Sequence, residues 1–186
     1  MGCDIHRYLE YKDKNADHWY STPISGQGFQ NYALFGFLEE GVREIHNHEK
    51  YYIHEPVGLP EDIGFHAKHD FYLTVNDEYA SKEYEKCITK EKAEKYITDW
   101  PYLKVIKNKD DEIEKIQDPN WYGMTYIDLE EFDKIIESYK KYLIKEEDIP
   151  EKFIDFYIIE IMATYNYMKT YNDCGYQTRI VYWFDS

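Results

Sequence analysis

Polar and apolar side chains alternate near the start of the chain, over "CDIHRYLEY" at residues 3–11. A two-residue period is typical of a β-strand, whose successive side chains point to opposite faces of a sheet. The pattern therefore predicts a strand with two different faces. One face carries Cys3, Ile5, Arg7 and Leu9, and the other carries Asp4, His6, Tyr8 and Glu10.

Further strands are predicted along the chain. Residues 71–75, "FYLTV", and 177–186, "QTRIVYWFDS", are rich in the β-branched and aromatic side chains that strands favour. Residues 102–116 hold two alternating segments around a polar turn at 108–111, a pattern that predicts a hairpin.

Two short segments have helical periodicity. Residues 31–45 favour a short helix with Asn31 as its N-cap and Gly41 at its end. Residues 89–100 favour another helix. The stretch between them, 46–70, is predicted to be a long irregular loop, and long ordered loops often carry function.

Two longer helices are predicted in the second half of the chain. The first begins at Asp128, whose spacing from Glu131 resembles a capping box, and has an apolar stripe along one side. Residues 150–171 are apolar nearly all round, which predicts a central, buried helix.

These elements indicate an α+β fold. No internal repeat or Gly/Ser-rich linker divides the chain, so a single domain over residues 1–186 is expected. We expect the two terminal strands to be neighbours in a mixed or antiparallel sheet, with the two long helices packed on one face.

The composition limits the classes of partner. The formal net charge is −15, which opposes nonspecific binding to nucleic acid or to an anionic membrane. Aromatic residues make up 18% of the chain, including 21 tyrosines, a content that argues against disorder. The acidic side chains indicate either a well-solvated surface or a surface attracted to a basic protein.

The expected location is the cytosol. The three cysteines are far apart and include no CxxC pair, which favours reduced thiols over disulfides. No apolar run is long enough to span a membrane, and the first residues lack the features of a signal peptide.

Asp4 and His6 are the first candidates for chemistry. Their spacing places a carboxylate beside an imidazole on one strand face, where Asp4 could orient His6 for acid–base work or share a metal with it. The alternative is a local pair that packs among tyrosines. Cys3 is expected on the opposite face, as a buried structural residue.

The predicted loop at 46–70 contains five of the seven histidines. In "HAKHD", His66, His69 and Asp70 could bind a divalent metal that activates water against a phosphate ester. Neither histidine pair of the loop matches a named zinc motif, and the alternative is a set of surface histidines.

Arginine is scarce, with three residues in the chain. Arg43, beside the His-rich loop, and Arg179, on the last strand, could each bind an anion, because a guanidinium binds phosphate through two hydrogen bonds. The alternative is that each pairs with one of the many acids.

Several segments resemble one protein family. In order these are "MGCDIH", "NYALFGFLEEGVR", "GLP" at 58–60, "YLT" at 72–74 and "RIVYWFDS". Together they resemble a family of small phage and prophage proteins that begin Met-Gly-Cys-Asp-Ile-His and are mostly uncharacterised. Members often carry a His-Ser-His-like element before the "YLT" strand, whereas this chain has "HAKHDFYLT" with different spacing. The resemblance implies that Cys3, Asp4, His6, Arg43 and the last strand share a common core.

Two functions compete. The first is a phage accessory protein, with a counter-defence role, that binds or hydrolyses a phosphate-bearing or nucleotide ligand as a phosphoesterase would, through Asp4, His6, Arg43, His66 and His69. The second is an acidic, binding-only inhibitor of a host nuclease, in the manner of an anti-CRISPR mimic of nucleic acid. Its partner would be a host defence protein.

Overall fold

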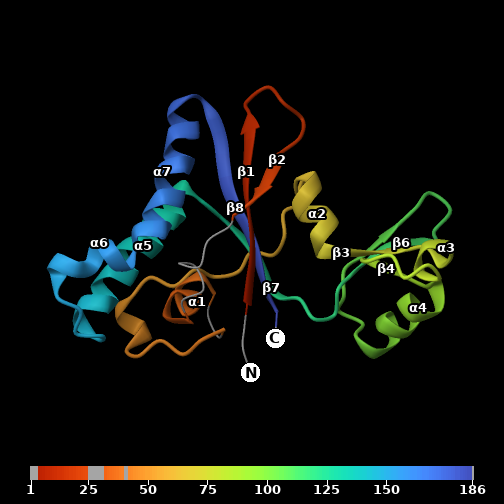
Figure 1. The fold of residues 1–186 in the computed structure, drawn as a ribbon, viewed down its shortest axis with the longest axis horizontal. Coiled ribbons are helices and arrows are strands. Elements are labelled where there is room, and N and C mark those ends of the chain that lie inside the picture. Colours follow the sequence, from red (N-terminus) through yellow and green to blue (C-terminus); the bar gives the residue numbers. More distant parts are fainter. Residues whose placement is uncertain (1–3, 25–31, 40–41, 186) are drawn as a thin grey trace.

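The N-terminal and C-terminal segments pair with each other at the centre of one sheet. The computed structural model describes residues 4–24, 32–39 and 42–185. Within this sheet, called the first sheet, the strand order is β2-β1-β8-β7 and every pairing is antiparallel (Figure 1). Its strands are β1 (Asp4–Asp13), β2 (Tyr20–Pro23), β7 (Tyr122–Asp128) and β8 (Tyr176–Asp185). The predicted pairing of the terminal strands is thus confirmed.

A second sheet lies to one side of the first (Figure 1), with strand order β4-β3-β6-β5. Its strands are β3 (Tyr72–Val75), β4 (Cys87–Ile88), β5 (Val105–Lys107) and β6 (Ile113–Gln117), accompanied by the helices α3 (Asp77–Ala80) and α4 (Lys90–Asp99). The predicted strand, hairpin and helix of this region are confirmed. Sequence analysis expected one sheet, because a two-residue period identifies strands but not their partners.

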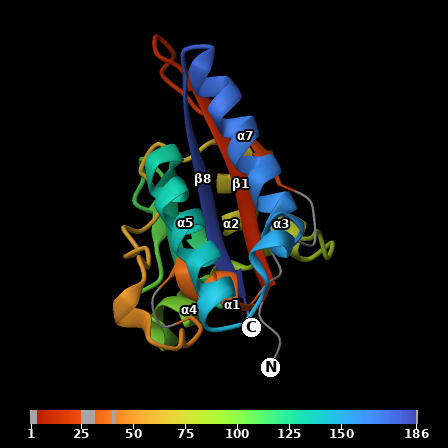
Figure 2. The ribbon, with the colours of Figure 1, turned by 90° about the vertical axis from the view of Figure 1, so that its left-hand side faces the viewer.

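Helices cover one face of the first sheet (Figure 2). They are α1 (Tyr32–Leu38), α5 (Leu129–Lys145), α6 (Ile154–Tyr157) and α7 (Ile159–Asp173). Ile5 and Leu9 of β1 pack in this core with alternate residues of β8, as the predicted alternation requires. The capping box at Asp128 and Glu131 is confirmed, since the Asp128 carboxylate accepts from the Glu131 N–H at 2.9 Å. The predicted N-cap Asn31, the terminating Gly41 and Cys3 lie outside the described residues.

The prediction of a buried central helix over 150–171 is wrong. This segment forms a 3₁₀ turn, η3 (Glu151–Phe153), and then α6 and α7, and much of its surface is exposed. Phe156 is 77% exposed and Ile159 is 63% exposed. A narrow stripe faces the core, made of Ile154, Ile158, Ile161 and Met168. A segment that is apolar all round does not define which side is buried, so here packing against α5 and β8 selects the stripe.

The other face of the first sheet contacts a short helix, α2 (Phe65–Phe71), which begins inside the predicted irregular loop and ends at the first residue of the predicted strand 71–75. Ala67 and Phe71 of α2 pack against Tyr8 and Trp183. Another part of that loop forms the 3₁₀ turn η2 (His48–Lys50). Because α2 runs directly into β3, it links the two sheets (Figure 1).

Glu39, just after α1, makes the stability of the fold depend on pH. Burial raises the pKa of its carboxyl to about 7, and its Oε2 atom has no hydrogen-bond partner among the described residues. Between the ordinary pKa of 4.5 and this raised value, the native state holds a proton that the unfolded state has lost. Stability therefore falls as pH rises through this window.

We expect Glu39→Gln to remove this dependence. Between pH 5 and pH 8, the free energy of unfolding of the parent should fall by about 1–2 kcal/mol more than that of the variant, after allowance for solvent screening. Urea denaturation of both proteins at pH 5 and pH 8 measures the difference. Equal pH dependence in parent and variant would contradict the prediction.

Candidate functional site

A cavity of about 400 Å³ opens where the two sheets meet. It is lined by His6, His69, Asp70, Glu85, Lys86 and Trp121, and is called the inter-sheet cavity below. His6 comes from β1, His69 and Asp70 come from α2, and Lys86 directly precedes β4. The fold therefore brings three of the sequence-predicted site residues together from two distant segments.

The ring of His6 is held on several sides. Its Nε2 atom lies 2.9 Å from Oδ2 of Asp185, and the backbone N–H of Asp4 donates to Oδ1 of the same carboxylate at 3.2 Å. Its ring centroid lies 4.5 Å from that of Trp121, and Trp183 stacks at 5.8 Å. This arrangement engages Nε2 and leaves Nδ1 as the ring nitrogen for a ligand.

The carboxylate that contacts His6 is thus Asp185, and not Asp4 as the sequence suggested. Asp4 lies at the exposed start of β1. In the register of the two terminal strands, Trp183 faces His6 and Asp185 faces Asp4. Asp185 therefore reaches the imidazole of His6 as a diagonal neighbour across the two strands, a contact that the spacing along β1 alone does not predict.

A second imidazole is anchored in the same way. Nδ1 of His69 lies 3.0 Å from Oδ1 of Asp70, and the Tyr8 hydroxyl donates to Oδ2 of Asp70. Burial opposes ionisation of Asp70, but the hydrogen bonds from Tyr8 and His69 outweigh it and hold the pKa of the carboxyl below its ordinary value. Asp70 is therefore a carboxylate at neutral pH, and Nε2 is the remaining ring nitrogen of His69.

Lys86 has an unusual backbone. Its φ of 63° lies in the left-handed region, which side chains other than glycine rarely adopt. Its Nζ donates to the Asp70 carbonyl at 3.0 Å and lies 4.7 Å from the Trp121 ring centroid. The ammonium has no carboxylate partner within the described ranges 4–24, 32–39 and 42–185, so its charge is available to an anion.

The predicted metal ligands are not assembled. Within the part of the chain that the structure describes, no three or more His, Cys, Asp or Glu side chains are grouped so as to hold a metal ion. Both carboxylate oxygens of Asp70 are already engaged by Tyr8 and His69. His66 is exposed, does not line the inter-sheet cavity and packs its ring against Phe65.

Arg43 does not line the inter-sheet cavity either. It follows α1, whose apolar side chains pack on the opposite face of the first sheet from His6. The structure therefore separates Arg43 from the imidazole with which the sequence hypothesis grouped it.

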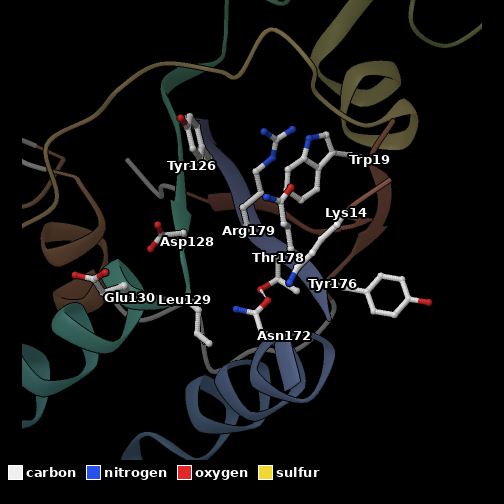
Figure 3. Close-up of a pocket in the computed structure, with 11 residues that line it drawn as sticks. Lys14, Trp19, Tyr126, Asp128, Leu129, Glu130, Asn172, Tyr176, Thr178 and Arg179 are labelled. Carbon is white, nitrogen blue, oxygen red and sulfur yellow. Dashed lines mark hydrogen bonds between the residues drawn. The ribbon is translucent and has the colours of Figure 1, made fainter. Parts of the chain in front are cut away.

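Arg179 borders a different cavity, of about 610 Å³ (Figure 3). Its Nε donates to Glu10 at 2.7 Å, and its Nη1 and Nη2 donate to Asp62 at 2.8 Å and 3.1 Å. Trp19 covers the guanidinium, with the ring centroid 3.9 Å away. All three guanidinium nitrogens therefore donate to Glu10 or Asp62. Arg179 pairs with acidic residues, which was the alternative to binding an anion.

Sequence reasoning missed Asp185, Lys86 and Trp121 as site residues. Asp185 was detectable in principle, because the terminal strands were predicted to be neighbours and their register places it opposite Asp4, diagonally across from His6. Lys86 and Trp121 belong to no motif.

None of the protein families, curated proteins or solved structures compared with this chain matches it. Among the described residues, no helix is long and apolar enough to cross a membrane.

Proposed function

We propose that the protein binds a small phosphate-bearing ligand of the nucleotide class in the inter-sheet cavity, and that His6 transfers protons in its hydrolysis. The observation that carries this proposal is that an imidazole anchored by Asp185 and the ammonium of Lys86, with no carboxylate partner among the described residues, border the same cavity. A phosphate ester needs a cation for its oxygens and a group that exchanges protons with the reacting atoms.

The dimensions and lining of the cavity agree with this ligand class. Its volume of about 400 Å³ lies within the range of small-molecule sites. Trp121 offers an aromatic wall, and Lys86 lies against that wall. A ligand that combines a charged phosphate with a flat, apolar ring matches these two features.

The biological setting is also part of the proposal. The resemblance to small phage proteins supports an accessory, counter-defence role in the host cytosol. A nucleotide is a ligand that such a protein would meet there.

Replacing Lys86 tests the binding proposal. We expect Lys86→Ala to weaken binding of adenosine monophosphate about tenfold, because a charge-assisted contact to phosphate contributes roughly 1.5 kcal/mol. Isothermal titration calorimetry at low salt measures the change. Lys82→Ala is the matched control, since Lys82 pairs with Glu78 on the surface and does not line the cavity.

Equal affinity in the Lys86 variant and the parent would contradict the proposal. The net charge of −15 favours the acidic inhibitor as the second candidate. Absence of nucleotide binding, together with a salt-sensitive complex with a basic nuclease, would favour that candidate.

A further inference from the structure

The inter-sheet cavity contains two imidazoles, each held by a carboxylate. Transfer of a proton to or from a single atom requires only one of them. Nε2 of His6 contacts the Asp185 carboxylate, and Nδ1 of His69 contacts the Asp70 carboxylate. Each ring therefore keeps one nitrogen with no hydrogen-bond partner among the described residues. The two rings come from β1 and from α2, so they approach the cavity from different elements.

We propose that His6 and His69 act as an acid–base pair on a small ribonucleotide phosphodiester whose own 2′-hydroxyl is the nucleophile. This inference rests on the proposed function and names its substrate class. One imidazole accepts a proton while the other, protonated, donates one. A carboxylate orients each ring. The Asp185 carboxylate also accepts from the Asp4 backbone N–H, and the Asp70 carboxylate also accepts from the Tyr8 hydroxyl.

The reaction balances without a further reactant. The 2′-oxygen attacks phosphorus and its proton passes to the neutral imidazole. The bond between phosphorus and the 5′-oxygen breaks, and the imidazolium protonates that oxygen. The products are a 2′,3′-cyclic phosphate and a free 5′-hydroxyl. Lys86 is placed to stabilise charge on the phosphoryl oxygens.

An internal nucleophile fits the groups that the cavity provides. The described residues offer imidazoles and one ammonium there, and no cluster of three or more metal-ligating side chains. A 2′-hydroxyl already attached to the substrate needs only a base, and intramolecular attack has an effective concentration of roughly 10⁵ M or more. Two imidazoles and a lysine are sufficient for this chemistry.

The charge around the cavity favours a short substrate. Glu85 and Asp70 line the cavity together with a single lysine, Asp185 contacts His6 of the same lining, and the whole chain carries a net charge of −15. A long RNA would be repelled along its length, whereas a dinucleotide places one phosphate beside Lys86. The substrate class is therefore a short ribonucleotide and not polymeric RNA.

The test compares ribodinucleoside monophosphates with their 2′-deoxy analogues. We expect the ribo compounds to yield 2′,3′-cyclic phosphate, detected by phosphorus NMR, and the deoxy compounds to remain intact. His69→Gln should lower the cleavage rate about 100-fold and remove one limb of the pH–rate profile. His66→Gln is the matched control, because it changes a histidine of the same helix that does not line the cavity.

The possible failures can be told apart. Cleavage of ribo and deoxy compounds at equal rates would overturn the internal nucleophile and leave the proposed function intact. Lys86-dependent binding of adenosine monophosphate without cleavage of any dinucleotide would also overturn the inference. If no nucleotide binds, both proposals fail. A His69 variant that has parental stability in urea and parental cleavage rates would overturn the acid–base pair alone.

Discussion

Arg179→Met is expected to lower the free energy of unfolding by about 3–5 kcal/mol, because it leaves a buried charge without its partner. Glu10 is completely buried, and Arg179 contacts its carboxylate at 2.7 Å. The Gly64 N–H remains as a donor to Glu10 at 2.6 Å, but a single neutral donor does not replace a guanidinium. Guanidinium chloride denaturation of parent and variant measures the loss.

The loss should also depend on pH. Burial raises the pKa of Glu10, and Arg179 opposes that rise. Without Arg179 the pKa rises further, so the native variant holds a proton on Glu10 that its unfolded state releases. The destabilisation is therefore expected to grow as pH rises above the ordinary glutamate range and to shrink toward pH 4.

Two further variants separate the buried pair from general effects. Glu10→Gln combined with Arg179→Met should recover a large part of the stability, since no buried charge is then unpaired. Lys134→Met removes a solvent-exposed pair with Glu130 and should leave the free energy of unfolding nearly unchanged. If Arg179→Met lowers the free energy of unfolding no more than Lys134→Met does, the buried pair of Arg179 and Glu10 does not stabilise the fold as predicted.

Asp185→Asn is expected to lower the phosphodiester cleavage rate about 100-fold while the affinity for adenosine monophosphate stays the same. An amide cannot stabilise the imidazolium of His6 and can select the wrong tautomer, although it preserves the shape of the side chain. Asp185 is therefore a positioning residue, and the signature of that role is a loss of kcat with little change in KM and a shifted pH–rate profile.

Asp185→Glu should restore part of the rate, because it returns the negative charge. His6→Gln should abolish the same proton transfer, and Asp185→Asn should bring no further loss when it is added to the His6 variant. The opposite pattern, a large loss in Asp4→Asn and none in Asp185→Asn, would restore the assignment made from the sequence.

Local periodicity predicted much of the fold. The alternation along β1 placed Ile5 and Leu9 in the core and His6 on the other face, as observed. The N-cap at Asp128 fixed the start of α5, since a capping box is a short-range device. Such features depend on residues a few positions apart, which is why one sequence is enough to find them.

The candidate site depends on contacts that local patterns do not encode. Asp185 reaches His6 only through the register of two strands from opposite ends of the sequence. Lys86 and Trp121 enter the cavity because the second sheet is placed beside the first. The pairing of Arg179 with Glu10 also required the register, since the two residues lie opposite each other on β8 and β1.

The pairing of β1 with β8 has a consequence for the order of folding. Contacts such as that between Asp4 and Asp185 span 181 residues of sequence, whereas the second sheet is built from the continuous stretch Tyr72–Gln117. Closing a long loop is slow, so we expect the second sheet to form early and the centre of the first sheet to form late. Because the inter-sheet cavity needs both sheets, ligand binding should appear only with the slowest refolding phase.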